Sequence, residues 1–340
     1  MDRSGGLVLT ATAGSLILAF LWKRSREKRH RVPCESWARW AMSKTDESSF
    51  QAPLLLTGVP LGECIDRWSD KYLERIIGET KISVHISNTR FLDFAAKNFK
   101  YEIMTFQGFL QRIQSSSEGT FLYYRSQHQK RNKASSLDAL GSIGDDFVMP
   151  GPLLAPFRVH STVLRVASTG LCMWLHYDVC DNFLCCIRGR KRVVLFHPND
   201  IDRLYVSGSS SAMGSRLLQK RGQTQLWKEF PLASAAWARR LEVVLNAGDI
   251  LFIPAFWPHC TEALPFKGSR SSISVNTFLQ RPEWDGLHDP KDVWANRELL
   301  PAQEATKGME KILPQLQELP PVPRAFYCHK MAAELLAMAN

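Results

Sequence analysis

The sequence lacks a CxxC pair, although it contains 8 cysteines. Without that spacing, neither a zinc ribbon nor a thioredoxin-like redox site is expected. Cys185 and Cys186 are adjacent in an apolar run, where neighbouring thiols do not easily form a disulfide. We therefore expect reduced, mostly buried cysteines and a reducing compartment. The chain also shows no internal repeat.

Charged side chains are absent from residues 5–22, which read GGLVLTATAGSLILAFLW. At the rise of an α-helix this segment spans roughly 27 Å, just enough to cross a bilayer. Trp22 suits the membrane interface, and a cluster of Lys and Arg follows within residues 23–32. A cleavable signal peptide would carry its positive charge before the apolar stretch instead.

The pattern predicts a transmembrane signal anchor at 5–22 and a basic juxtamembrane segment at 23–32. By the positive-inside rule residues 23–340 then face the cytosol, from the endoplasmic reticulum or the outer mitochondrial membrane. The alternatives are a targeting presequence that is removed, or a cytoplasmic protein whose N-terminus lies further along the chain.

Residues 33–285 carry short strand signals in close succession, with polar turns between them and helical spacing only at 64–78 and 105–114. This pattern favours a mainly β sandwich or barrel over βαβ units. A polar, Ser-rich stretch at 206–235 interrupts the series. The expected strands are 53–58, 81–86, 120–124, 171–178, 183–187, 191–196, 241–245, 250–254 and 272–279.

The apolar period becomes helical in residues 286–340, which predicts a helical C-terminal extension. We expect helices at 293–300, 306–319 and 327–338, with Pro314 kinking or splitting the second one. Such an extension often packs on a neighbouring copy, so a homodimer through these helices is expected.

His176 and Asp178 are two apart at the end of a predicted strand, so their side chains project to the same side. An H-x-D pair alone is weak evidence, because a core histidine beside a solvated aspartate is common. His259, however, follows another apolar strand and supplies a third ligand. Two histidines and one carboxylate with open positions for O₂ and a co-substrate are typical of non-haem Fe(II) oxygenases.

Lys191 lies in a basic run, but strand alternation places it with Val193 on one face and Arg190 with Arg192 on the other. A cation on the inner face suits the distal carboxylate of 2-oxoglutarate, whose 2-oxo acid end chelates iron. Asn182 and Tyr123 are neutral donors that could assist.

The segments 174–182, 189–196 and 247–259 resemble those of the JmjC family of Fe(II)/2-oxoglutarate oxygenases. The resemblance implies a double-stranded β-helix of the jelly-roll, cupin-like kind. It also implies His176, Asp178 and His259 as iron ligands. Three residues are implied as 2-oxoglutarate contacts: Tyr123, Asn182 and Lys191. The family's tyrosine pair is shifted by one place here, so Tyr124 remains an alternative to Tyr123.

Flanking segments at 58–62, 93–99 and 231–240 resemble members that hydroxylate wybutosine-type modified guanosine in tRNA(Phe). Half of the net charge of +10 lies within residues 1–31, so the body is only mildly basic. Basic stretches at 125–133, 188–192, 216–221 and 239–240 are candidate tRNA phosphate contacts. The alternatives are a JmjC hydroxylase that acts on a protein side chain, and a non-catalytic cupin-type binding protein.

Overall fold

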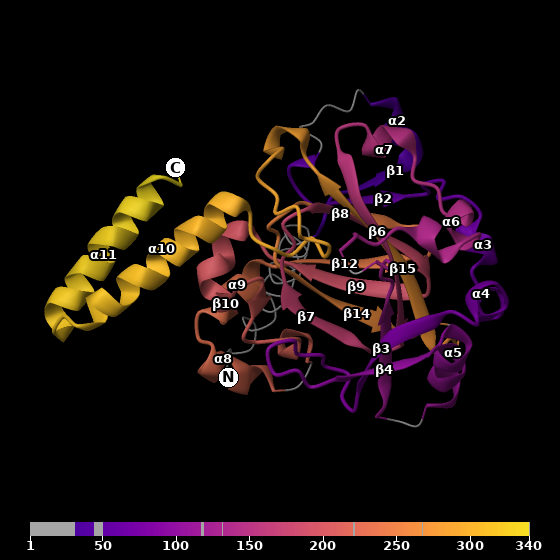
Figure 1. The fold of residues 1–340 in the computed structure, drawn as a ribbon, viewed down its shortest axis with the longest axis horizontal. Helices are drawn as coiled ribbons and strands as arrows, with labels where there is room; N and C mark the ends of the chain where they lie inside the picture. The colour runs from indigo at the N-terminus through magenta and orange to yellow at the C-terminus, as the bar shows by residue number, and fades with distance from the viewer. Residues whose placement is uncertain are drawn as a thin grey trace, which may run out of the picture.

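Two facing β-sheets form the body of the protein in the computed structural model, which describes residues 31–43, 50–116, 119–130, 132–219, 222–266 and 268–339 (Figure 1). The larger sheet contains, in spatial order, β1 (Cys34–Ser36), β2 (Leu54–Thr57), β13 (Ile250–Ile253), β8 (Asp181–Arg188), β15 (Ser271–Gln280), β6 (Arg158–Ser168), β5 (Phe121–Arg125), β3 (Lys81–Ser87) and β4 (Lys100–Thr105). The smaller sheet contains β10 (Val206–Ser207), β11 (Ser210–Ser211), β7 (Cys172–His176), β14 (His259–Leu264), β9 (Arg190–Leu195) and β12 (Leu241–Asn246).

Alternation along β9 shows how the sheets pack. Val193 points between the sheets and packs with Leu184 and Leu251 of the larger sheet. Val194 points the other way, into a cluster with Leu226, which lies in the chain segment between β11 and β12. Because both faces of β9 are buried, the smaller sheet lies between the larger sheet and an outer cover. The predicted mainly β fold with helices is confirmed.

Helices cover the outer faces of both sheets. The larger sheet packs against short helices from the first half of the chain, with Phe106, Phe109 and Leu110 of α5 fully buried. The smaller sheet is covered by α8 and α9, which bury Leu226 and Ala236. The helices outside the C-terminal region are α2 (Trp37–Met42), α3 (Cys64–Arg67), α4 (Asp70–Ile77), α5 (Phe106–Ser115), α6 (Ile143–Asp146), α7 (Gly151–Leu154), α8 (Gln223–Glu229) and α9 (Ala233–Arg239).

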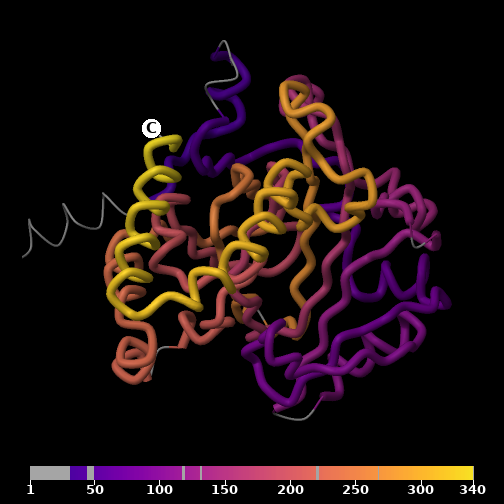
Figure 2. Tube along the Cα trace, turned by 60° about the vertical axis from the view of Figure 1, so that its left-hand side comes forward, coloured from indigo at the N-terminus to yellow at the C-terminus, as the bar shows by residue number. Residues whose placement is uncertain are grey.

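The predicted C-terminal helical region is present as a hairpin of α10 (Leu300–Gln317) and α11 (Pro321–Ala337). The hairpin projects to one side of the sheets in Figure 1, and the turned view of Figure 2 brings it in front of them. Neither helix has a buried residue. Helix α10 continues through Pro314, so of the two expected effects of this proline, a kink or a split, the split does not occur.

The predicted helix at 293–300 is also wrong, because 293–299 are irregular. Asp292 accepts hydrogen bonds from the N–H groups of Trp294 and Arg297, at 2.9 and 3.0 Å, and Ala295 has a positive φ of 60°. These local bonds replace a helical ladder.

Within the described residues, no helix combines the length and the apolar character that crossing a membrane requires. The predicted anchor at 5–22 lies outside those residues.

The cysteines are free and mostly buried, as expected, with Cys34 and Cys328 exposed.

Candidate metal centre

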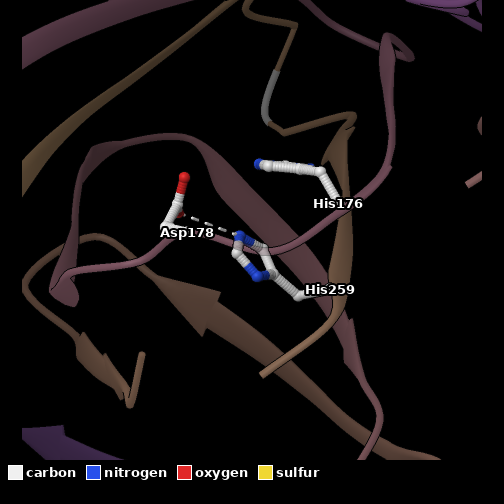
Figure 3. Close-up of side chains that lie close together, drawn as sticks. All are labelled: His176, Asp178 and His259. Carbon is white, nitrogen blue, oxygen red and sulfur yellow. Dashed lines mark ion pairs between the residues drawn. The ribbon is translucent and has the colours of Figure 1, made fainter. Parts of the chain in front are cut away.

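His176, Asp178 and His259 meet between the two sheets (Figure 3). Their ligand atoms all lie within 4.8 Å of one another, and His259 Nε2 is 3.8 Å from Asp178 Oδ2. The two imidazole rings are 4.5 Å apart between centroids. His259, which is distant in the sequence, therefore lies close enough to His176 and Asp178 for the three to bind one ion.

Strand pairing brings the two histidines together, because His259 at the start of β14 is the direct antiparallel partner of His176 at the end of β7. Asp178 is not on the strand, which ends at His176, so the expected continuation of this strand through residue 178 is wrong. The loop is fixed instead by a hydrogen bond from Phe256 N to Asp178 O at 2.9 Å. This bond connects the two ligand-bearing segments.

Each histidine is held in one tautomer by its own neighbouring backbone. His176 Nδ1 lies 2.9 Å from the carbonyl oxygen of Trp174, and His259 Nδ1 lies 2.9 Å from that of Trp257. A carbonyl oxygen only accepts, so each neutral ring carries its proton on Nδ1 and leaves the Nε2 lone pair free. A hydrogen bond from the second ring nitrogen to a backbone carbonyl group is typical of metal-binding histidines.

Burial disfavours the charged forms of the His176 and Asp178 side chains. It lowers the pKa of His176 well below its ordinary value, and the neighbouring His259 lowers it further. Burial raises the pKa of Asp178, although His259 and two arginines oppose that shift. A divalent ion would favour the neutral imidazoles and the carboxylate that ligation requires.

A narrow recess of about 30 Å³ continues from the three ligands into the space between the sheets. Lys191 lines it, is buried and donates to Ser274 Oγ at 2.8 Å. Burial lowers the pKa of Lys191 to about 8. Val193 is also buried while Arg190 and Arg192 are half-buried, so the expected alternation along this strand is confirmed.

Tyr123 lines the recess, and its hydroxyl accepts a hydrogen bond from Arg165 Nη1 at 2.7 Å. Tyr124 points into the core, where its ring packs on Phe106 and Phe109. Of the two tyrosines, only Tyr123 is placed where a co-substrate could contact it.

Asn182 is buried but is not among the residues that line the recess. Its Oδ1 accepts a hydrogen bond from Asn276 Nδ2 at 3.1 Å, and Asn276 itself lines the recess. Sequence reasoning missed Ser274 and Asn276. Their polar side chains lie two residues apart in strand β15, which is buried along almost its whole length. This period of two was the sequence signal that could have identified them.

A second, larger cavity of about 270 Å³, the open cavity, is lined by two of these ligands, His176 and Asp178. Five tyrosine, tryptophan or phenylalanine side chains line it: Phe94, Tyr101, Tyr123, Trp174 and Trp294. Phe94 and Tyr101 are exposed at 46% and 60%. Arg125, which begins the basic stretch expected to contact tRNA phosphates, lines it as well, and so does Arg165, which was not predicted. Arg165 lines both spaces and so connects them.

Two facing sheets around a buried two-histidine, one-carboxylate constellation define a cupin-like protein of the JmjC type. A family model described as "Cupin-like domain" matches residues 45–283, so the chain belongs to this family.

Curated relatives cover most of the chain. It is 34% identical over 296 residues to tRNA wybutosine-synthesizing protein 5 of Danio rerio, covering 84% of this chain and 86% of that protein. It is 32% identical over 292 residues to the Homo sapiens protein of the same name, covering 83% and 88%. It is also 35% identical over 298 residues to tRNA wybutosine-synthesizing protein 4 of Neurospora crassa, covering 85% of this chain but only 23% of that protein.

Proposed function

We propose that the protein is an Fe(II)- and 2-oxoglutarate-dependent hydroxylase that acts on a wybutosine-type modified guanosine in tRNA(Phe). The observation that carries the proposal is the convergence of His176, Asp178 and His259, with both Nε2 lone pairs free, where the narrow recess meets the open cavity. The names of the relatives support the substrate class.

The donor set fits ferrous iron, since two imidazoles and one carboxylate leave three positions for 2-oxoglutarate and O₂. When bound, iron would couple decarboxylation of 2-oxoglutarate, giving succinate and CO₂, to insertion of the second oxygen atom of O₂ into a substrate C–H bond. Lys191 would hold the distal carboxylate of the co-substrate at the closed end of the recess. Tyr123 would contribute a neutral hydrogen bond.

The open cavity suits a flat base. Trp174 stacks parallel to Phe99 with an interplanar angle of 9°, and Phe94 lies 5.3 Å from Trp174 between ring centroids. Single-stranded RNA is commonly recognised by stacking unpaired bases on such rings. Tyr101 adds an exposed ring beside them.

Several of the basic side chains expected to contact phosphates are already paired with acids. Arg192 pairs with Glu242 and Glu262, Arg216 with Glu229, and Arg239 with Asp200. The better candidates are exposed lysines that form no ion pair within the described residues and lie within three positions along the chain of a residue that lines the cavity: Lys97, Lys100 and Lys130. Lys100 directly precedes the cavity residue Tyr101. These three lysines would hold the anticodon-loop backbone.

The deciding experiment is mass spectrometry of tRNA(Phe) nucleosides from cells with and without the gene. Loss of the hydroxylated nucleoside, restored by the wild-type chain but not by His176→Ala, is the expected result. An unchanged hydroxywybutosine level would remove this substrate. A protein substrate would instead give hydroxylated peptides and binding that depends little on salt, whereas tRNA binding should weaken steeply with salt.

A further inference from the structure

Arg125 and Arg165 face each other across two strands, as direct antiparallel partners on β5 and β6. Both line the open cavity. Among the described residues, neither forms an ion pair with an acid, and the Nε–H group of each is buried without a hydrogen-bond partner. Like charges directly opposite in a sheet are destabilising. An anion bound between them would offset that cost.

Both guanidinium groups are held in place before any ligand binds. Arg125 stacks on the Trp294 ring at 4.2 Å and donates to the Trp294 carbonyl oxygen at 3.3 Å. Arg165 donates to the Tyr123 hydroxyl at 2.7 Å. A planar guanidinium fixed by stacking presents its remaining N–H groups in a geometry that matches a carboxylate or phosphate. Little conformational entropy remains to be lost on binding.

The charges around the metal centre are unbalanced. Among the described residues that line the two spaces, Asp178 is the one acid, against the cations Arg125, Arg165 and Lys191. The dianionic co-substrate reaches Lys191 through the recess, and Arg165 borders both spaces. Arg125 lines only the open cavity, so it is the cation placed to meet the primary substrate.

We propose that Arg125 is a specificity-determining residue that binds an anionic group of the primary substrate, a carboxylate or a phosphate. This assignment rests on the proposed function and deepens it, because it requires an acidic substrate. The source is a carboxylate on the modified base or a phosphate of the RNA backbone. The same charge disfavours a lysine or arginine side chain as substrate.

The test measures binding of tRNA(Phe) anticodon stem-loops to the manganese-loaded protein with 2-oxoglutarate, where no turnover occurs. Three stem-loops are compared: one whose modified guanosine carries a free carboxylate, one with that carboxylate methylated, and one with unmodified guanosine. The variants are Arg125→Gln, Arg125→Lys and a control, Arg158→Gln. Arg158 lies on the same strand as Arg165, is exposed and pairs with Asp285 at 2.7 Å.

Arg125→Gln should weaken binding roughly 10- to 150-fold, the loss of one charge-assisted hydrogen-bonded pair. Arg125→Lys should recover part of the loss, and Arg158→Gln should bind like the wild type. A loss confined to the free-carboxylate stem-loop identifies the base carboxylate. An equal loss on all three identifies a phosphate.

Wild-type affinity of Arg125→Gln for all three stem-loops, in a variant that still binds manganese, would overturn the assignment and leave the proposed function intact. If the wild-type protein binds no stem-loop, the proposed function fails and the assignment fails with it. The two failures are thus distinguished by the wild-type measurement.

Discussion

The titration of Lys191 should set the pH range over which 2-oxoglutarate binds. Burial lowers the pKa of this ammonium to about 8, nearby Cys186 partly opposes the shift, and Arg165 adds to it. The distal carboxylate of the co-substrate requires the charged form. At pH 9, one unit above that pKa, roughly one tenth of the protein carries the charge, so the apparent Kd should be about 10-fold weaker than at pH 7.

The measurement is calorimetric titration of the manganese-loaded protein with 2-oxoglutarate between pH 6.5 and 9.5. Pyruvate is the matched control ligand, because it offers the same 2-oxo acid chelate without a distal carboxylate. Its affinity should lack the loss above pH 8. The Lys191→Gln variant should bind 2-oxoglutarate roughly 10- to 150-fold more weakly near neutral pH, with a flat profile. Parallel profiles for the two ligands would refute the role of Lys191.

The same lowered pKa of Lys191 predicts that raising the pH stabilises the ligand-free fold, although it weakens 2-oxoglutarate binding. Between pH 8 and about 10.4 the unfolded chain holds more protons than the folded one, so Lys191 makes the free protein more stable as pH rises through that window. Below pH 8 the cost of burying the charge is constant. Lys191→Met should therefore stabilise the ligand-free protein at pH 7 by on the order of 2 kcal/mol, after the lost Ser274 hydrogen bond is allowed for. Urea denaturation of the variant and the wild type measures this difference in the free energy of unfolding.

Four further predictions follow from other parts of the molecule. His176→Ala or Asp178→Ala should abolish binding of Mn(II) and turnover, and continued succinate production by either variant contradicts the ligand assignment. Asp146 accepts hydrogen bonds from three side chains, including the buried Trp68, and these outweigh burial to lower its pKa. Asp146→Ala should therefore cost about 2–4 kcal/mol in urea denaturation, and this contribution should persist above pH 4 and fade below it. Sedimentation should show a dimer that becomes monomeric when 300–340 are removed, because the hairpin leaves apolar side chains exposed; a monomeric full-length chain contradicts this. Alkaline carbonate should leave the intact chain in the membrane fraction if the predicted N-terminal anchor exists, whereas release refutes it.

The metal constellation could be predicted from the sequence because its determinants are short. Two ligands lie two residues apart, and the third follows a strand and a tight turn. The inward-facing residues of β9 could be predicted equally well, since alternation within one strand decides whether Lys191 or Arg192 points inward. These inferences need local periodicity and no knowledge of which strands pair.

The walls of the two cavities depend on strand register and could not be predicted this way. A β-bulge between Ile273 and Ser274 shifts the pairing of β15 with β8, and Ser274 meets Lys191 on the inner face. The same strand places Asn276, and not Asn182, on the wall of the recess. Arg125 and Arg165 come from strands whose pairing no local pattern specifies.

The two parts of the site therefore depend on the fold in different ways. Each histidine is oriented by the carbonyl group of a tryptophan two residues earlier, so the unit Trp-x-His at 174–176 recurs at 257–259 with the same 2.9 Å contact. The fold needs only to pair these preformed units, which the register of β7 and β14 does directly. The position of the Arg125 guanidinium depends on three segments at once. The Trp294 ring stacks on it, and the like charge of Arg165 on the paired strand repels it. Substitutions that shift these segments by a fraction of an ångström should change substrate choice well before they disturb metal binding.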